Sequence, residues 1–282
     1  MEEDVILLRC GELFLKGKNQ GYFERYLQRN VFQQIGLSAK QLRGRFLLPY
    51  FPEHSIISQI FGFTSYSPAV CVEKKIEDIT VMALQLMDGC FGTFKIETNR
   101  ADKQFPLTSV EINMLVGKQL EEQKKLTYAR NNPQHTLKVE INQDGAYLFT
   151  KTFPCGGGLP VGVEGKVILL LENEASILAG ILIMKRGCAI IPVSLNEEED
   201  ISLLQKYSPL HLILRKVYSK EDILEIAQKE NALALVTGEI FDLIEKIDFL
   251  GLEKKEFLLP VFKPLVGYSE ENVTEGLKKY AR

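Results

Sequence analysis

Lys16 and Lys18 are the first residues along the chain whose type and spacing could hold a phosphate group. They flank Gly17 and precede a segment with helical periodicity. The N-terminus of a helix presents unpaired N–H groups that favour anions, and two ammonium groups would add charge that neutralises a nucleic-acid backbone. The spacing by itself favours a plain solvated turn, so the phosphate role is a hypothesis.

A second basic group surrounds the loop that follows residues 93–98. Lys95, Arg100 and Lys103 are close in sequence, and the loop ends at Phe105. Basic side chains beside an aromatic ring suit single-stranded RNA, whose phosphates need charge and whose unstacked bases need a flat surface. Because Phe105 comes just before a proline in an apolar context, it is more typical of a core anchor than of a stacking platform.

The turn from Leu171 to Ser176 is a third place for phosphate chemistry. It follows the first strand of what reads as an α/β domain, where such domains hold phosphates. The turn has no glycine that would let the backbone wrap a pyrophosphate, and it carries Glu172 and Glu174. Like charges this close would oppose the binding of a triphosphate. The sequence therefore predicts that this turn does not hold ATP.

Metal and nucleophile chemistry find no support in the sequence. An odd, dispersed set of cysteines predicts neither a zinc site nor a disulfide framework, and no serine or cysteine stands near a histidine in a nucleophile turn. The acidic run at residues 197–200 is more typical of a helix N-terminus than of a metal cluster. The scattered residues are Cys10, Cys71, Cys90, Cys155, Cys188, His54, His135 and His211.

Charge is distributed unevenly along the chain, whose net charge is −3. Residues 1–160 contain 19 Lys and Arg against 17 Asp and Glu, whereas residues 161–282 contain 15 against 20. Contact with a polyanion is therefore expected in the first half. No apolar stretch approaches the ~20 residues that span a bilayer, and the acidic first residues are unlike a secretory signal. We expect a cytoplasmic protein that makes no membrane contact.

The elements that would position these residues show two patterns. Up to residue 158, short strands and helices predict two α+β units, with a strong hairpin signal at residues 143–145. Beyond it, continuous apolar strands alternate with helices, which indicates a parallel sheet covered on both faces. The expected helices are 20–35 (with Asn19 as N-cap), 54–60, 76–87, 107–122 (capped by Thr108 or Ser109), 175–185, 197–207, 220–230, 240–247 and 270–280. The expected strands are 5–10, 45–50, 65–73, 93–98, 136–142, 146–151, 166–171, 189–193, 210–214, 232–236 and 257–261.

Three motifs together resemble one known family, the tRNA 4-thiouridine synthetases, also called thiamine-biosynthesis sulfurtransferases. Residues 8–19 (LRCGELFLKGKN) are similar to the first domain of that family, except that Cys10 stands where a tyrosine is usual. Residues 98–109 (TNRADKQFPLTS) look like its THUMP domain, and residues 157–166 (GGLPVGVEGK) look like its junction into the third domain. The shorter runs 184–187, 235–239 and 260–267 keep the same order, so the resemblance covers nearly the whole chain.

The resemblance implies an α+β front half followed by a Rossmann-like α/β domain. The expected domains are a ferredoxin-like domain (1–73), a THUMP RNA-binding domain (74–158) and a PP-loop domain of the adenine nucleotide α-hydrolase type (159–282). In the family, ATP with Mg²⁺ adenylates a tRNA uridine and a persulfide sulfur displaces the adenylate, while the front domains hold the tRNA acceptor end. The residues expected to supply charge to tRNA are Arg9, Lys16, Lys18, Lys95, Arg100 and Lys103.

Three departures from the family pattern fall on its chemistry. Active members have an SGGxDS loop, of which only Ser176 lines up here, after the strand that ends at Leu171. These two residues are the candidate nucleotide-loop positions. No cysteine follows Cys188, although the family carries a sulfur-handling cysteine near its Thr-Gly-Glu strand. The run expected after Glu239 is replaced, and the sequence has no rhodanese segment. Together these departures suggest lost catalysis, with no ATP and no metal held by this chain.

The sequence leaves three functions open. The first is a non-catalytic or accessory tRNA-binding member of the family, linked to tRNA thiolation. The second is an active ATP-dependent tRNA sulfurtransferase with an atypical loop, taking sulfur from a cysteine desulfurase or another donor. The third is an α/β domain that has become a protein-interaction platform or the face of a homodimer.

Overall fold

The computed structural model describes residues 3–195, 199–240 and 259–281, without the side chains of residues 14–16. The chain forms two compact units. The first consists of Met1–Cys10, Leu37–Ser58 and Phe63–Cys155, and the second of Gly11–Gly36, Gln59–Gly62 and Gly156–Arg282.

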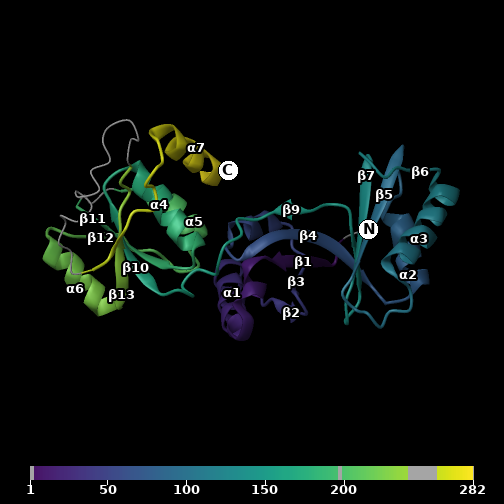
Figure 1. The fold of residues 1–282 in the computed structure, drawn as a ribbon, viewed down its shortest axis with the longest axis horizontal. Helices are drawn as coiled ribbons and strands as arrows, with labels where there is room; N and C mark the ends of the chain where they lie inside the picture. Colours follow the sequence, from purple (N-terminus) through teal and green to yellow (C-terminus); the bar gives the residue numbers. More distant parts are fainter. Residues whose placement is uncertain (1–2, 196–198, 241–258, 282) are drawn as a thin grey trace. The chain divides into compact units, whose positions relative to one another are not determined.

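The first unit is built on a single nine-stranded sheet (Figure 1). Strand β4 is the longest of these strands. It pairs with β1 near its start and with β8 near its end, both antiparallel, whereas β5 pairs with β7 in parallel. The strand order is β2 (Lys40–Leu42), β3 (Arg45–Pro49), β1 (Val5–Cys10), β4 (Phe63–Val72), β8 (Ala146–Phe149), β7 (His135–Ile141), β5 (Thr93–Arg100) and β6 (Thr127–Tyr128), with β9 (Phe153–Pro154) paired to β4.

Two helices, α2 (Ile76–Leu86) and α3 (Ser109–Lys124), cover the β5–β7–β8 end of this sheet. Their buried residues recur at three- and four-residue spacing, as helix geometry requires of one face. Thr108 caps α3 in a reciprocal capping box with Glu111, which confirms one of the two predicted caps. The short 3₁₀ helix η2 (His54–Gln59) stands at the predicted helix 54–60.

The second unit contains a five-stranded parallel sheet, as the apolar runs predicted. Its order is β12 (Arg215–Lys216), β11 (Ala189–Ser194), β10 (Lys166–Leu171), β13 (Ala232–Val236) and β14 (Val261–Phe262).

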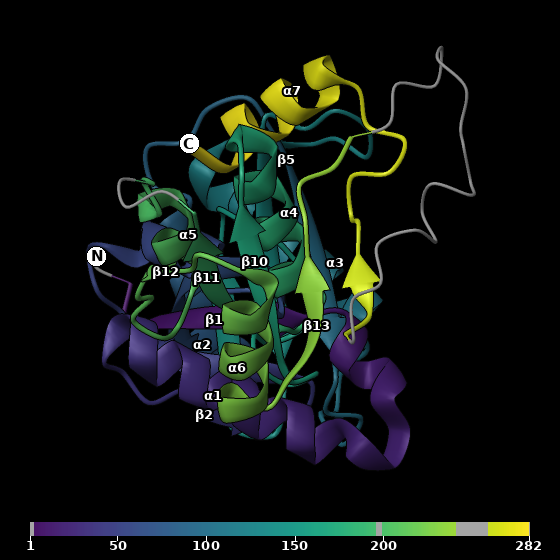
Figure 2. The ribbon, with the colours of Figure 1, turned by 90° about the vertical axis from the view of Figure 1, so that its left-hand side faces the viewer.

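Helices cover both faces of this sheet. One face packs against α4 (Glu174–Lys185), α5 (Ser202–Tyr207) and α7 (Glu270–Ala281). The other packs against α6 (Lys220–Glu230), which Figure 2 shows in front of the strands. The expected fold class, α+β followed by α/β, is confirmed.

Helix α1 (Gln20–Ile35) also belongs to the second unit and follows the 3₁₀ helix η1 (Glu12–Asn19). The buried amide of Asn30 donates to the carbonyl of Val161 at 3.0 Å, which ties α1 to the start of the α/β segment. The prediction of Asn19 as a side-chain cap is wrong. Asn19 has helical backbone angles and makes no capping bond, because η1 continues directly into α1.

Two other predicted elements differ from the structure. Residues 210–214 form no strand. The side chain of Gln205 donates to the carbonyl of Leu210 and accepts from the N–H of Leu212. These backbone groups are therefore not available for hydrogen bonds to a neighbouring strand. The short strand β12 begins only at Arg215. Helix α5 begins at Ser202 rather than at residue 197. The predicted helix 240–247, apart from its first residue, and the first part of the predicted strand 257–261 lie outside the described residues.

Candidate functional site

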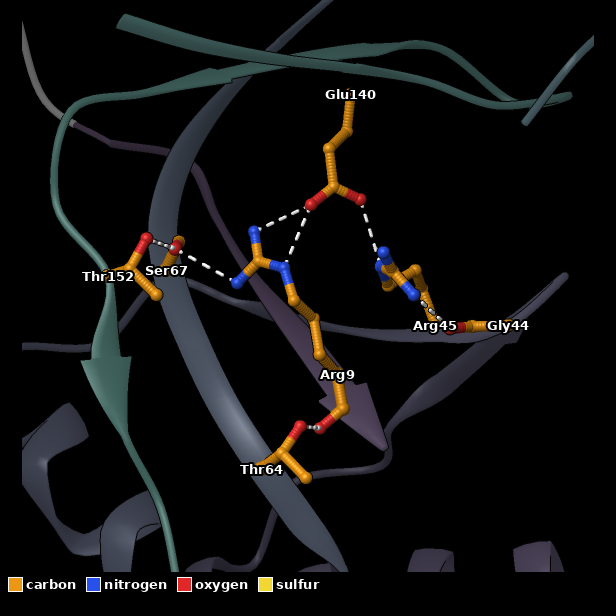
Figure 3. A network of polar contacts seen from close by, with 7 residues as sticks. All are labelled: Arg9, Gly44, Arg45, Thr64, Ser67, Glu140 and Thr152. Carbon is orange, nitrogen blue, oxygen red and sulfur yellow. Dashed lines mark hydrogen bonds and ion pairs between the residues drawn. The ribbon is translucent and has the colours of Figure 1, made fainter. Parts of the chain in front are cut away.

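Arg9 is anchored in the nine-stranded sheet by a network of polar contacts (Figure 3). Its guanidinium donates from Nε to Glu140 Oε1 at 2.8 Å and from Nη1 to Ser67 Oγ at 3.1 Å. It also lies 4.7 Å from the centre of the Phe149 ring. Only 15% of the Arg9 side chain is exposed. The charge of this predicted RNA contact is therefore directed mainly at Glu140.

Arg45 completes this network from β3, and sequence reasoning missed it. Its Nε donates to Glu140 Oε2 at 2.9 Å, so each carboxylate oxygen of Glu140 accepts from a different arginine. Glu140 is on β7 and is 131 residues from Arg9 and 95 from Arg45. No short-range motif marks such a contact, because it joins β7 to β1 and β3, which are far apart in the sequence and are not neighbours in the sheet.

The loop after β5 is rigidly held. The Arg100 guanidinium donates to the carbonyl of Phe105 at 2.6 Å. The Asp102 carboxylate accepts from Lys74 at 2.8 Å and from the N–H of Gln104 at 3.0 Å. Lys74, and next the Gln104 N–H, hold the pKa of Asp102 below its usual value. Phe105 is buried in the core with α2 and α3, in agreement with its reading as an anchor.

Lys103 is the exposed cation that this loop presents. Its side chain has no ion pair within the ranges that the structure describes. Lys95 on β5 is only 31% exposed and pairs with Glu97 at 2.8 Å. Of the three cations predicted around this strand and loop, one is therefore fully available to a polyanion.

The Lys16–Lys18 segment lies in η1 rather than in an open loop. Gly17 has φ +53° and ψ −124°, which breaks the helical geometry between the two lysines and leaves Lys18 exposed. The side chain of Lys16 lies outside the described part of the structure. Both lysines belong to the second unit, whereas the other four predicted RNA contacts belong to the first.

In the turn from β10 into α4, the side chains of Asn173 and Ser176 form hydrogen bonds within the turn. Asn173 caps α4, because its Oδ1 accepts from the N–H of Ser176 at 3.1 Å and from its hydroxyl at 3.3 Å. The Ser176 hydroxyl in turn accepts from the N–H of Glu172 at 3.2 Å. A Cβ added to Gly238, just after β13, would clash with the Ser176 backbone. Ser176 and Leu171, the two candidate nucleotide-loop residues, are both buried.

A pocket of about 300 Å³ opens beside this turn, at the carboxyl ends of the parallel strands. Ligands of open α/β sheets bind at this end. Its walls are mostly apolar, with Glu172, Glu239, Lys220 and Lys263 as the charged residues that line it. Lys263 forms an ion pair with Glu239.

Three of the five cysteines show little nucleophilic character. Burial raises the pKa of Cys155 to about 12, and burial also raises the pKa values of Cys71 and Cys188. The thiolate is the reactive form of cysteine, so these three are held in the unreactive state. Across residues 3–195, 199–240 and 259–281, no group of three or more His, Cys, Asp or Glu is placed to hold a metal ion. Among the same residues, no helix is long and apolar enough to cross a membrane.

Comparison with known families defines the class of protein that this fold represents. A profile for the ThiI ferredoxin-like domain matches residues 5–67, and a profile for the THUMP domain matches residues 73–151. With the parallel sheet that follows, these matches define a THUMP-domain protein that carries an α/β third part.

Full-length relatives identify the family. The protein named "Probable tRNA sulfurtransferase" of Natranaerobius thermophilus is 30% identical over 96% of this chain and 81% of its own length. The protein of the same name from Anoxybacillus flavithermus is 30% identical over 97% and 82%. This chain belongs to the tRNA sulfurtransferase family.

Two solved structures agree with this assignment. The crystal structure of PH1313 from Pyrococcus horikoshii is 27% identical, with a TM-score of 0.86 over 99% of this chain and 100% of its own. A 4-thiouridine synthetase, solved as an RNA complex with bound ATP, is 28% identical, with a TM-score of 0.82 over 99% and 85%.

Proposed function

We propose that this chain binds tRNA, contacting its acceptor end, and serves tRNA thiolation as a non-catalytic or accessory member of its family. The THUMP and ferredoxin-like segments supply the RNA-binding part, and Lys103 and Lys18 are exposed cations within them. Such a role belongs in the cytoplasm. A separate protein, such as a cysteine desulfurase, would have to supply the sulfur, and the transfer of sulfur to tRNA would have to be catalysed outside this chain.

The observation that carries the non-catalytic part is the acidic turn before α4, in which the Ser176 N–H already donates to Asn173. ATP needs donors for its phosphates, and in this fold they come from the first turn of the helix after the first strand. Here Asn173 accepts from the Ser176 N–H in that turn, and Glu172 and Glu174 are exposed beside it. These residues do not fit a triphosphate with Mg²⁺, so no adenylation step is assigned to this chain.

Filter binding of the full chain to unfractionated tRNA tests the RNA-binding part. Affinity should fall steeply between 50 and 200 mM salt, because each neutralised phosphate releases counterions. Lys103→Gln and Lys18→Gln should each weaken binding and lower the salt slope by about 1. The control is Lys229→Gln, an exposed lysine near the end of α6, which should change neither. Absence of tRNA binding at 50 mM salt would refute the proposal.

The pocket at the carboxyl ends of the strands favours a second candidate, an ATP-dependent tRNA sulfurtransferase with an atypical loop. Lys220 and Lys263 line it and could face phosphates that approach along another route. Calorimetry of the full chain with ATP and Mg²⁺ separates the two functions. A dissociation constant for ATP in the micromolar range would favour the ATP-dependent sulfurtransferase, and the absence of measurable heat would favour the non-catalytic, accessory function.

A further inference from the structure

A groove of about 650 Å³ in the second unit carries more positive than negative charge. It lies where the end of α4 meets η1 and the segment after β14. Lys185, Arg186 and Lys263 line it, and Glu12 is the one carboxylate among its lining residues. This excess of cations is unexpected in the acidic half of the chain.

Two of these cations have no partner among the residues that the structure describes. The side chains of Lys185 and Arg186 form no ion pair or hydrogen bond with any described residue, whereas Lys263 pairs with Glu239. Burial, and next the nearby Lys279 and Arg186, hold the pKa of Lys185 below its usual value. A partly buried ammonium group with two cations nearby is costly, and Glu12 offsets this cost only in part, so an anion in the groove would lower it further.

The backbone holds these cations in place. The N–H of Leu159 donates to the carbonyl of Lys185 at 3.0 Å, at the last turn of α4. Gly158 makes this approach possible, because its φ of +75° is left-handed and an added Cβ would clash with the Lys185 carbonyl. The groove is therefore built on a fixed helix end rather than on a loose loop.

Aromatic rings stand beside the charges. Phe262, on β14, lines the groove and keeps 46% of its surface exposed, and Tyr268 lines it too. Cations that track a backbone, next to rings on which bases stack, are the combination that binds single-stranded nucleic acid.

We propose that this groove binds a single-stranded stretch of RNA, with a backbone phosphate at Lys185 and Arg186 and a base against Phe262. This site lies in the α/β unit and would add a contact beyond the THUMP and ferredoxin-like segments. It rests on the proposed function, since it requires that the full chain binds tRNA.

The test compares the full chain with its Lys185→Gln, Arg186→Gln double variant in tRNA filter binding at several salt concentrations. The double variant should bind about tenfold more weakly at 100 mM salt, and its salt slope should be lower by about 1. Phe262→Leu should weaken binding of RNA with a single-stranded 3′ end at least about fivefold, and binding of a blunt duplex much less. Lys229→Gln is the matched control, because it removes a last-turn lysine from the helix on the opposite face of the same sheet.

The outcomes separate the groove from the proposed function. Wild-type binding with an unchanged affinity and salt slope in the double variant overturns the groove and leaves the proposed function standing. Absence of wild-type binding overturns both. Inorganic phosphate provides a further arm in thermal unfolding. If the double variant loses only a stabilisation by inorganic phosphate and keeps wild-type tRNA binding, the groove is a free-anion site and the RNA proposal is wrong.

Discussion

Glu140 accepts from two arginines and so offsets much of their positive charge. The side chains of Arg9 and Arg45 are 15% and 23% exposed, and each donates to one oxygen of the Glu140 carboxylate. We predict that Glu140→Gln lowers the free energy of unfolding by about 1–3 kcal/mol, because two partly buried guanidinium groups lose their counter-charge. Urea unfolding followed by circular dichroism measures the loss.

The matched control is Glu97→Gln in the same sheet. Glu97 pairs with Lys95, but its side chain is 46% exposed, so the pair contributes at most about 1 kcal/mol. Equal losses for the two variants would contradict the structural role of Glu140. If Glu140→Gln instead strengthens tRNA binding, Arg9 is an RNA contact that Glu140 restrains.

Glu230 gives a pH dependence at the residue scale. Hydrogen bonds from Arg215, and next from Lys166, lower its pKa to about 2, from an ordinary value of 4.5. A lowered carboxylate pKa contributes stability above pH 4.5 that is lost as the pH falls towards 2. At pH 7 the Tm of the wild type should therefore be higher than that of Glu230→Gln. This difference in Tm should become smaller as the pH falls from 4.5 to 3. High salt should reduce it as well, because the side chains of Glu230, Lys166 and Arg215 are partly exposed to solvent. A Tm difference that is constant over this range would show that these ion pairs do not stabilise the fold.

At the scale of elements, the start of α4 links stability to the proposed absence of nucleotide binding. Asn173 provides the cap that the Ser176 N–H needs. We predict that Asn173→Ala lowers the free energy of unfolding by about 1 kcal/mol, the usual contribution of an N-cap side chain. Asn131→Ala, at an exposed position in the first unit, is the control and should change it little. If Asn173→Ala costs nothing, the turn is held by other contacts and its donors are free for a ligand.

Periodicity and caps made most elements predictable from the sequence. The α1 and α6 bounds agree with the apolar spacing, and Thr108 was identifiable because a glutamate follows it by three residues. The short strands β2, β6, β9 and β12 were not predicted, since two or three residues carry no periodic signal. The wrong strand at 210–214 has a similar origin, because its apolar run does not show that the Gln205 side chain occupies its backbone.

The candidate site was less predictable than the fold. The sequence identified Lys103 and the acidic turn, because both are local. It could not show that Glu140 engages Arg9, or that Arg186 lines a groove with Phe262, because these contacts join strands and helices far apart in the chain. The sequence shows which residues are charged, but only the tertiary contacts show whether a charged side chain is already paired or is exposed to a ligand.

At the scale of the whole molecule, RNA binding and nucleotide binding are expected to be independent. A ligand that binds only the folded state raises Tm in proportion to the logarithm of its concentration over Kd. Because exposed carboxylates flank this turn and the Ser176 N–H already donates to Asn173, 5 mM ATP with Mg²⁺ should leave Tm unchanged, whereas tRNA should raise it at low salt.

The affinity for tRNA, measured with and without ATP, provides a second test of whether ATP binds. If one ligand changes the affinity for a second, the second changes the affinity for the first by the same factor. Because this chain is proposed not to bind ATP, the affinity for tRNA should be the same with and without ATP. If ATP raises Tm, or if adding ATP changes the affinity for tRNA severalfold, the chain is better described as an ATP-dependent tRNA sulfurtransferase. Repeating both measurements with AMP would then show whether the β- and γ-phosphates are needed for the effect.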